Sequence, residues 1–280
     1  MFIREFLQVK AVKMLIGNQD IINFFKRAQR LNFLAGSYIF LGDPQIGKFT
    51  FAKALAESFE SNKSSILNDA LILQLGSPLG IYQARQLKNF LWQTPVISPY
   101  RTAIVDNSER LTPEAQNALL KIIEEPPLQA LIILTSSYPE TLTPTLLSRL
   151  KKIYFKKISQ EQVRQWLEDS FRVKPALAEF AARRSMGRPG LAYNLLYDTN
   201  TKKLEKQVAV FIKGDIFEKY KIINEIVKDE ELFSRFIEFL VLELRNKFLV
   251  KNYKVVKEIL ARLTYLKRFN LNKKLQLEII

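Results

Sequence analysis

The stretch "GDPQIGKFT", residues 42–50, constrains the fold more than any other part of the sequence. It nearly matches the phosphate-binding loop G-x-x-x-x-G-K-[ST], in which a glycine-rich turn joins a strand to a helix. Before it, "GSYIFLGD" has the pattern of a short buried strand. After it, "FTFAKALAESFE" places Phe51, Leu55 and Phe59 at helical spacing. The sequence therefore predicts an α/β domain built around this loop.

The loop supplies most of a phosphate site. Gly42 and Gly47 permit the tight path, the backbone amides and helix N-terminus face an anion, and Lys48 can reach the outer phosphates. Phe49 stands where a Ser or Thr hydroxyl would bind Mg²⁺. Thr50 comes one residue late, about 100° further round the helix. We favour phosphate-loop ancestry over an ordinary strand–helix turn, and disfavour present hydrolysis.

A second apolar strand ends in "AIVDNSE" and delivers Asp106. P-loop enzymes place an Asp that organises Mg²⁺ at the end of such a strand. In ATPases with an Asp-Glu pair the second carboxylate polarises the attacking water, but here Asn107 follows, and an amide cannot accept a proton. The alternative is that Asp106 simply ends a strand. Two motifs that each lack a required group favour a degenerate nucleotide site.

Strands and helices alternate up to about residue 156. Helices are expected over "QDIINFFKRAQRL", over "IYQARQLKNFLWQTP" with Ile81, Leu87 and Phe90 in the core, and over "PEAQNALLKIIEE" after the N-cap Thr112. A short helix should follow Thr143. "RTAIV", "ALIILTSS" and "KKIYFKKI" have the pattern of strands. This alternation predicts a mainly parallel, doubly wound sheet.

After residue 156 the sequence has only helical patterns. Ser159 and Gln162 form a capping box, and Trp166 lies at core spacing on the helix that follows. From about residue 200 the patterns are long and amphipathic. We expect three parts: an α/β domain at 1–156, a small helical lid at 157–198 and a helical domain at 199–280.

Composition excludes several kinds of chemistry. The chain has no Cys and no His, so there are no disulfides, no cysteine-based zinc site and no histidine base or ligand. With 48% apolar residues it should be globular. No apolar run reaches the roughly 18 residues that span a bilayer, and the start lacks a signal-peptide pattern. We expect a soluble, cytoplasmic protein without membrane association.

The net charge of +15 is uneven. Residues 1–150 carry 15 Lys and Arg against 12 Asp and Glu, whereas residues 151–280 carry 28 against 16. A basic second half could face a polyanion such as DNA, or could serve solubility alone. The lysines of residues 251–274 pose the same choice, and there we favour a solvated helical face.

Three stretches carry a family resemblance: "MLIGNQDIINFFKRA", "LTPEAQNALLKIIEEPP" and "TPTLLSRLKKIYF". They resemble the clamp-loader branch of the AAA+ ATPases, and most of all its bacterial DNA polymerase III delta-prime subunits, over roughly residues 14–195. The resemblance implies an AAA+ module, a lid and a helical collar at the C-terminal domain. It also implies a five-subunit ring with gamma/tau and delta subunits, which opens a sliding clamp and places it on primed DNA.

The resemblance also implies roles for single residues. Lys48 matches the phosphate-loop lysine, Asp106 the Walker B aspartate and Ser137 the sensor-1 position. Arg149 of "SRL" matches an arginine that reaches into a neighbouring subunit's ATP site. Taken without the resemblance, Arg149 only closes a short helix, where the helix dipole favours a cation.

Several positions depart from the family pattern. Leu150 replaces a cysteine, the zinc-binding cysteines of many relatives are absent, and Gly190 stands where ATPase relatives place a sensor-2 arginine, two residues after Arg188. Together with Phe49 and Asn107, these departures favour a delta-prime-like subunit that requires no cofactor; weak binding of ATP or ADP stays open.

Three hypotheses therefore remain. The favoured one is a non-hydrolysing clamp-loader subunit that donates Arg149 to a neighbour's ATP. The second is an ATP-hydrolysing, gamma/tau-like subunit in which Thr50 or water replaces the lost ligand. The third is a basic nucleic-acid-binding protein unrelated to clamp loading.

Overall fold

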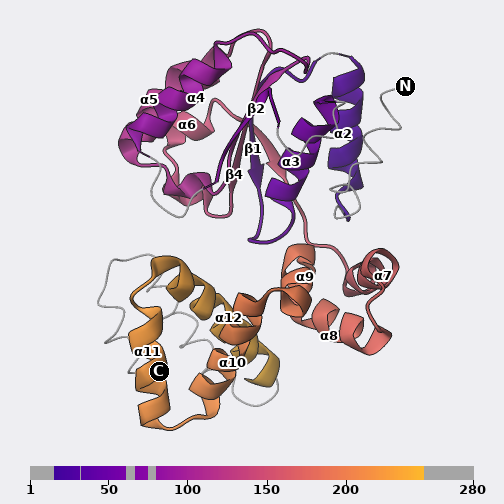
Figure 1. Ribbon diagram of the computed structural model, residues 1–280, viewed down its shortest axis with the longest axis vertical. Coiled ribbons are helices and arrows are strands. Elements are labelled where there is room, and N and C mark those ends of the chain that lie inside the picture. The colour runs from indigo at the N-terminus through magenta and orange to yellow at the C-terminus, as the bar shows by residue number, and fades with distance from the viewer. Residues whose placement is uncertain (1–15, 32, 61–66, 75–79, 249–280) are drawn as a thin grey trace. The chain divides into compact units, whose positions relative to one another are not determined.

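The structure, a computed structural model, describes residues 16–31, 33–60, 67–74 and 80–248 of the 280 (Figure 1). The chain divides into two compact units, residues 1–192 and 193–280, and each is described by itself. The strands are β1 Gly36–Leu41, β2 Ala70–Leu73, β3 Arg101–Val105, β4 Ala130–Ser136 and β5 Lys151–Tyr154. The helices of the first unit up to β5 are α2 Gln19–Arg30, α3 Lys48–Phe59, α4 Ile81–Leu91, α5 Pro113–Glu124 and α6 Pro144–Leu147, with 3₁₀ turns η2 Ser108–Arg110 and η3 Pro139–Thr141.

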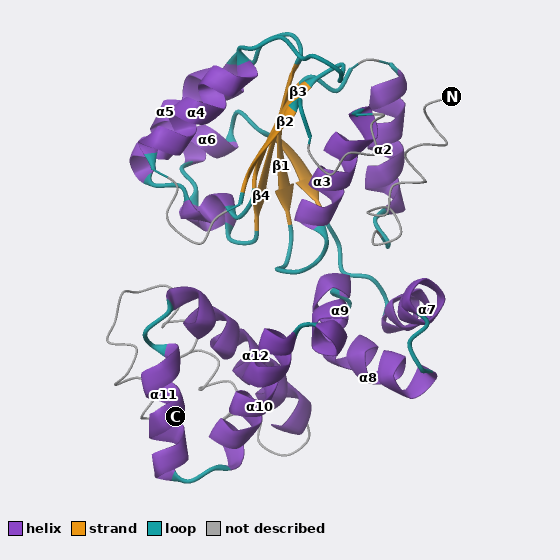
Figure 2. Ribbon diagram, viewed as in Figure 1, coloured by secondary structure: helices purple, strands orange, loops and turns teal. Residues whose placement is uncertain are grey.

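The strands form one parallel sheet in the order β2-β3-β4-β1-β5 (Figure 2). Gly36 of β1 lies opposite Leu131 of β4, and Val105 of β3 lies opposite Leu134. Every residue of β3 and β4 is buried, as expected for central parallel strands covered on both faces. The predicted doubly wound α/β fold is confirmed.

Two helical layers cover the sheet: α4, α5 and α6 lie on one face, and α2 and α3 on the other (Figure 1). The first layer packs on the sheet through an aliphatic core that includes Leu119 and Ile132. The second is strongly aromatic, with Phe25 in edge-to-face contact with both Phe40 and Phe51. Such ring pairs add to the free energy gained by burial alone.

Most of the helix caps and core residues predicted from local sequence lie where they were expected. Thr112 accepts a hydrogen bond from the Ala115 amide at the start of α5, and Ser159 with Gln162 closes the predicted capping box. Thr143 occupies the N-cap position of α6, but its side chain makes no capping hydrogen bond. Trp166 is buried, as predicted.

The predicted core of α4 was partly wrong. Ile81 is 43% exposed because it begins the helix at its solvent side. The buried face is formed by Ala84, Leu87 and Leu91, and Phe90 is only partly buried.

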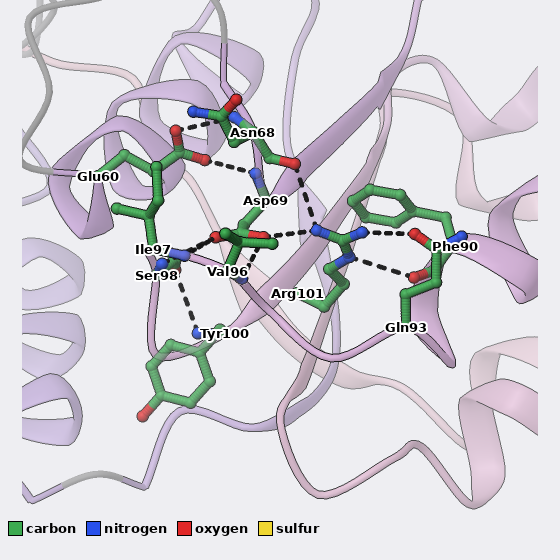
Figure 3. Close-up of polar contacts among 10 residues, drawn as sticks. All are labelled: Glu60, Asn68, Asp69, Phe90, Gln93, Val96, Ile97, Ser98, Tyr100 and Arg101. Carbon is green, nitrogen blue, oxygen red and sulfur yellow. Dashed lines mark hydrogen bonds and ion pairs between the residues drawn. The ribbon is translucent and has the colours of Figure 1, made fainter.

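Strand β2 was not predicted, and a buried ion pair fixes the chain beside it (Figure 3). Asp69, just before β2, is 1% exposed and accepts hydrogen bonds from the amides of Val96, Ile97 and Ser98. The Nη1 of Arg101, the first residue of β3, donates to Asp69 Oδ1. The segment between α4 and β3 is therefore held by one buried carboxylate.

The rest of the first unit is helical and includes the region expected to form the lid. It comprises α7 Gln160–Phe171, α8 Pro175–Ser185 and the start of α9 Pro189–Tyr197, and α7 packs on α8. The second unit contains α10 Thr199–Lys213, α11 Ile216–Ile226 and α12 Glu230–Phe248, with Phe211 of α10 edge-to-face against Phe236 of α12.

The helices predicted after residue 200 are thus present as far as α12. The lysines of residues 251–274 lie outside the described residues. The predicted boundaries at 156 and 198 stay predictions. None of the helices in the described ranges combines the length and apolar character needed to cross a membrane.

Candidate nucleotide-binding site

The strand order brings the predicted site residues to one edge of the sheet. Strands β1, β4 and β3 are adjacent and parallel, so their carboxyl ends meet at the same edge, where ligands of open α/β sheets bind. The loop Gly42–Gly47 follows β1, Asp106 follows β3, and Ser137 follows β4. Gly47 starts α3 with φ of +105°, a conformation that favours glycine.

Lys48 is tied to the chain's own acceptors. Its Nζ donates to the carbonyl of Gly42 at 2.7 Å, to the carbonyl of Asp43 at 2.9 Å and to the Oγ of Ser137 at 2.9 Å. An ammonium group has three donors. All three are therefore used inside the protein, and the residue is only 6% exposed.

The charge of Lys48 is strongly influenced by its surroundings. Burial lowers the pKa of Lys48 from its ordinary value to about 8, against the carboxylates of Glu109, Asp106 and Asp43, which raise it. At neutral pH the side chain is still mostly protonated. The loop therefore keeps its cation, surrounded by three carboxylates of the same chain.

Asp106 is likewise committed to internal partners. Its Oδ1 accepts from the Thr135 hydroxyl at 2.6 Å, and its Oδ2 accepts from the Asn107 side-chain amide at 3.1 Å. Burial raises the pKa of Asp106, while the hydrogen bonds from Thr135 and Asn107 and the charge of Lys48 act to lower it. Asn107 thus binds Asp106 rather than standing in for the missing carboxylate.

Phe49 occupies the position of the loop where the pattern places a metal-binding hydroxyl. Phe49 packs against the aromatic core cluster of α2, α3 and β1. Among the hydrogen bonds of the described residues, none joins Thr50 to Asp106 or Lys48. No group of three or more acidic, His or Cys side chains in those residues is arranged to hold a metal ion. The site has the geometry of a phosphate loop, with Phe49 where the loop pattern places a hydroxyl.

Glu109 is a site residue that the sequence analysis missed. Its Oε1 accepts from the amide of Ser137 at 3.3 Å, and its Oε2 is buried without a hydrogen-bond partner. The 3₁₀ turn η2, directly after β3, carries this carboxylate back toward the end of β4. An acid three residues beyond the strand-terminal Asp was the signal available in the sequence.

The lid contacts the phosphate loop through backbone atoms at Gly190. The Gly190 amide donates to the Gln45 carbonyl at 2.9 Å, and a Cβ at position 190 would lie 2.7 Å from that oxygen. Arg188 is buried, and its Nε donates to the carbonyl of Ser185. Gly190 stands at the position expected for a sensor-2 arginine. Its backbone lies so close to the Gln45 carbonyl that a side chain there would force the backbone to shift.

Arg149 lies at the surface, just after α6. Its Nε pairs with Glu124 Oε2 at 2.7 Å, and its Nη1 donates to the carbonyl of Thr145 at 2.9 Å. The side chain of Arg149 is 33% exposed and that of Glu124 is 54% exposed. Its contacts are with Glu124 of α5 and Thr145 of α6. Lys48, Asp106 and Ser137 instead follow adjacent strands at the carboxyl edge of the sheet.

The chain is similar to known subunits of DNA polymerase III. A family model described as DNA polymerase III, delta subunit, matches residues 68–159. The gamma/tau subunit of DNA polymerase III from Mycoplasma pneumoniae is 27% identical over 187 residues, covering 61% of this chain and 26% of the relative. That from Mycobacterium bovis is 30% identical over 150 residues, covering 47% and 26%.

These matches are to subunits of DNA polymerase III. The chain spans about a quarter of the length of the curated relatives that it matches. Solved structures of other proteins share the fold. A DNA polymerase III gamma subunit-related protein from Thermotoga maritima has a TM-score of 0.52 at 22% identity, covering 90% of this chain and 95% of its own. The RuvB branch migration motor from the same organism has a TM-score of 0.52 at 18% identity, covering 97% and 91%.

Proposed function

We propose that this chain is a structural subunit of a DNA polymerase III clamp loader, of the delta-prime kind, which assembles with gamma/tau and delta subunits in a five-membered cytoplasmic ring. In this role it requires no nucleotide of its own and helps the ring to place a sliding clamp on primed DNA. The matches to DNA polymerase III subunits support the assembly, and the pocket chemistry supports a non-hydrolysing member.

The observation that carries the proposal is the contrast between Lys48 and Arg149. Lys48 donates all three of its hydrogen bonds to its own chain. Within the described residues, Arg149 is held by an exposed ion pair and one carbonyl. Exposed ion pairs contribute about 0–1 kcal/mol, so little free energy opposes the transfer of Arg149 to another acceptor. An arginine supplied to a neighbouring site stabilises the charge that develops on the transferred phosphoryl group.

A gamma/tau-like ATPase is the second candidate, because the curated relatives carry that name and the G-x-x-x-x-G-K pattern is intact. The test is a pull-down with purified gamma/tau and delta subunits, followed by ATPase assays of the isolated chain and of the reconstituted ring. A ring that forms and turns over ATP around an inactive isolated chain supports the proposal. An isolated chain that turns over ATP through Lys48 supports the second candidate.

A further inference from the structure

Glu109 reaches the pocket because the chain turns sharply after β3. Asn107 adopts a left-handed conformation with φ of +51°, and the Ser108 hydroxyl donates to the carbonyl of Thr135 at 2.9 Å. These two features bind the turn η2 to the end of β4. Glu109 is then directed at the amide of Ser137, the residue whose hydroxyl accepts from Lys48.

The Oε2 of Glu109 has no hydrogen-bond partner, although it is buried. Buried polar atoms are almost always hydrogen-bonded, so an orphan calls for a reason. The hydrogen bonds made by Glu109 Oε1 and by Lys48 converge on the same residue, Ser137. Glu109 and Lys48 therefore interact through their charges without a direct hydrogen bond between them.

The carboxylate of Glu109 is unfavourable for a phosphate beside Lys48. Glu109 is the carboxylate whose charge acts most strongly on the Lys48 ammonium, followed by Asp106 and Asp43. Two of these carboxylates have another cation as well: Asp43 pairs with Lys157, and the charge of Arg110 acts on Asp106. Glu109 has no ion pair of its own among the described residues. In a working phosphate loop the lysine supplies its charge to the outer phosphates. A nucleotide entering here would bring more negative charge toward Glu109 and would have to compete for Lys48.

We propose that Glu109 is an internal counter-ion to the charge of Lys48 and keeps nucleotide phosphates out of the loop. Its negative charge opposes nucleotide binding in a loop whose glycines and lysine are intact. This effect adds to that of the missing magnesium ligand at position 49. The inference concerns the chain's own pocket and does not depend on Arg149.

The other chemistry open to a carboxylate at this place is that of a general base for an attacking water. The two roles predict opposite results on neutralising Glu109. The counter-ion role predicts that nucleotide affinity rises. A base predicts that ATP turnover present in the unchanged protein is lost.

The experiment measures binding of ATP and ADP to the full chain by isothermal titration at pH 7, without Mg²⁺ so that metal binding does not contribute. Glu109→Gln keeps the shape and the acceptor for the Ser137 amide, and should bind both nucleotides at least tenfold more tightly than the unchanged chain. Adding Lys48→Ala should abolish the gain. Glu140→Gln, an exposed glutamate on η3, is the matched control and should leave affinity unchanged.

Equal or weaker affinity in Glu109→Gln, including no detectable binding in either protein, would overturn the proposal. So would an ATPase of the unchanged chain that disappears in the variant. If Glu109→Gln does not fold, Glu109→Ala takes its place, because removing the carboxylate predicts the same gain. Failure of this test leaves the proposed role of Arg149 untouched, since that role is measured in the assembled ring.

Discussion

The ammonium of Lys48 lies 2.9 Å from the hydroxyl of Ser137, although the two residues are 89 positions apart in the sequence. The contact exists because β1 and β4 are neighbours in a parallel sheet, so the loop after one meets the chain after the other. It fixes a buried cation at the place where a phosphate loop would present one. Both the stability and the chemistry of this edge of the sheet therefore depend on how Lys48 is charged.

The buried Lys48 should make stability depend on pH. Its pKa is about 8 in the fold and ordinary when unfolded, so between these values the unfolded chain holds a proton that the folded chain has released. Stability should therefore rise with pH above about 8. Relative to Lys48→Met, the free energy of unfolding should increase by on the order of 2 kcal/mol between pH 8 and pH 10, at about 1.4 kcal/mol per unit of pKa difference.

Urea denaturation at several pH values measures this difference. The control is Lys53→Met, at an exposed lysine on the same helix. The free energy of unfolding of the unchanged chain relative to this variant should not rise between pH 8 and pH 10. A difference between the chain and Lys48→Met that stays flat across this range would mean that Lys48 is not buried as described.

The carboxylate of Asp69 should be among the most important polar groups for stability. Burial raises the pKa of Asp69, but the three amide donors and Arg101 outweigh it and bring the pKa below its ordinary value. Asp69→Ala leaves Arg101 buried without its partner, which should cost about 3–5 kcal/mol. Because the folded pKa is depressed, this contribution is present at neutral pH and is lost as the pH falls through it.

Chemical denaturation at pH 7 and at pH 3 tests the Asp69 prediction. The gap between the unchanged chain and Asp69→Ala should narrow at the lower pH. Lys53→Ala breaks an exposed pair with Glu57 and should cost less than about 1 kcal/mol. Equal effects of the two substitutions at pH 7 would contradict the assignment.

The contact between Gly190 and Gln45 should not tolerate a side chain. In Gly190→Ala the added methyl would lie 2.7 Å from a backbone oxygen, and overpacking of this kind costs about 1–3 kcal/mol. Hydrogen exchange should accelerate in residues 43–48 and 188–192 while β3 and β4 stay protected. Gly80→Ala, whose methyl would lie 3.6 Å from Gln83 Oε1, is the control. Unchanged exchange at the loop would show that lid and loop do not touch there.

Much of the fold followed from local sequence signals. The strand–loop–helix around Lys48, the start of α5 at Thr112 and the capping box at Ser159 each combine a periodic apolar pattern with a cap or turn residue, and each formed as predicted. Strand β2 had neither. It has four residues, of which only Leu73 is buried, and it is defined by pairing with β3. Short strands that depend on a distant partner leave little local pattern to detect.

The site was predicted less completely than the fold, for a related reason. The sequence analysis named Lys48 from the loop motif, Asp106 from the strand that it ends and Ser137 from the family resemblance. Glu109 reaches the pocket only through a left-handed residue and a 3₁₀ turn, and Thr135 through the pleat of β4. Their partners lie about 28 residues away in sequence. Such pairings are set by tertiary structure and not by spacing.

The isolated chain should have negligible ATPase activity. Phe49 offers no hydroxyl to bind magnesium. Asn107 donates a hydrogen bond to Asp106, and its side-chain amide cannot act as a base. A coupled assay with Mg²⁺ and millimolar ATP should give the same background rate for the unchanged chain and for Lys48→Ala. Turnover that Lys48→Ala abolishes would instead favour the gamma/tau-like alternative.

Arg149 carries the central claim, and the ATPase of the reconstituted ring tests it most directly. In single-turnover measurements on rings containing Arg149→Ala, hydrolysis at the one site next to this subunit should slow by roughly 10³-fold or more, with the ring still assembled. Two controls should leave the hydrolysis rate at every site within about twofold of that in the unchanged ring. Glu124→Gln only releases Arg149, and Arg183→Ala removes an exposed arginine of α8. Unaltered hydrolysis at all sites in the Arg149→Ala ring would contradict the claim.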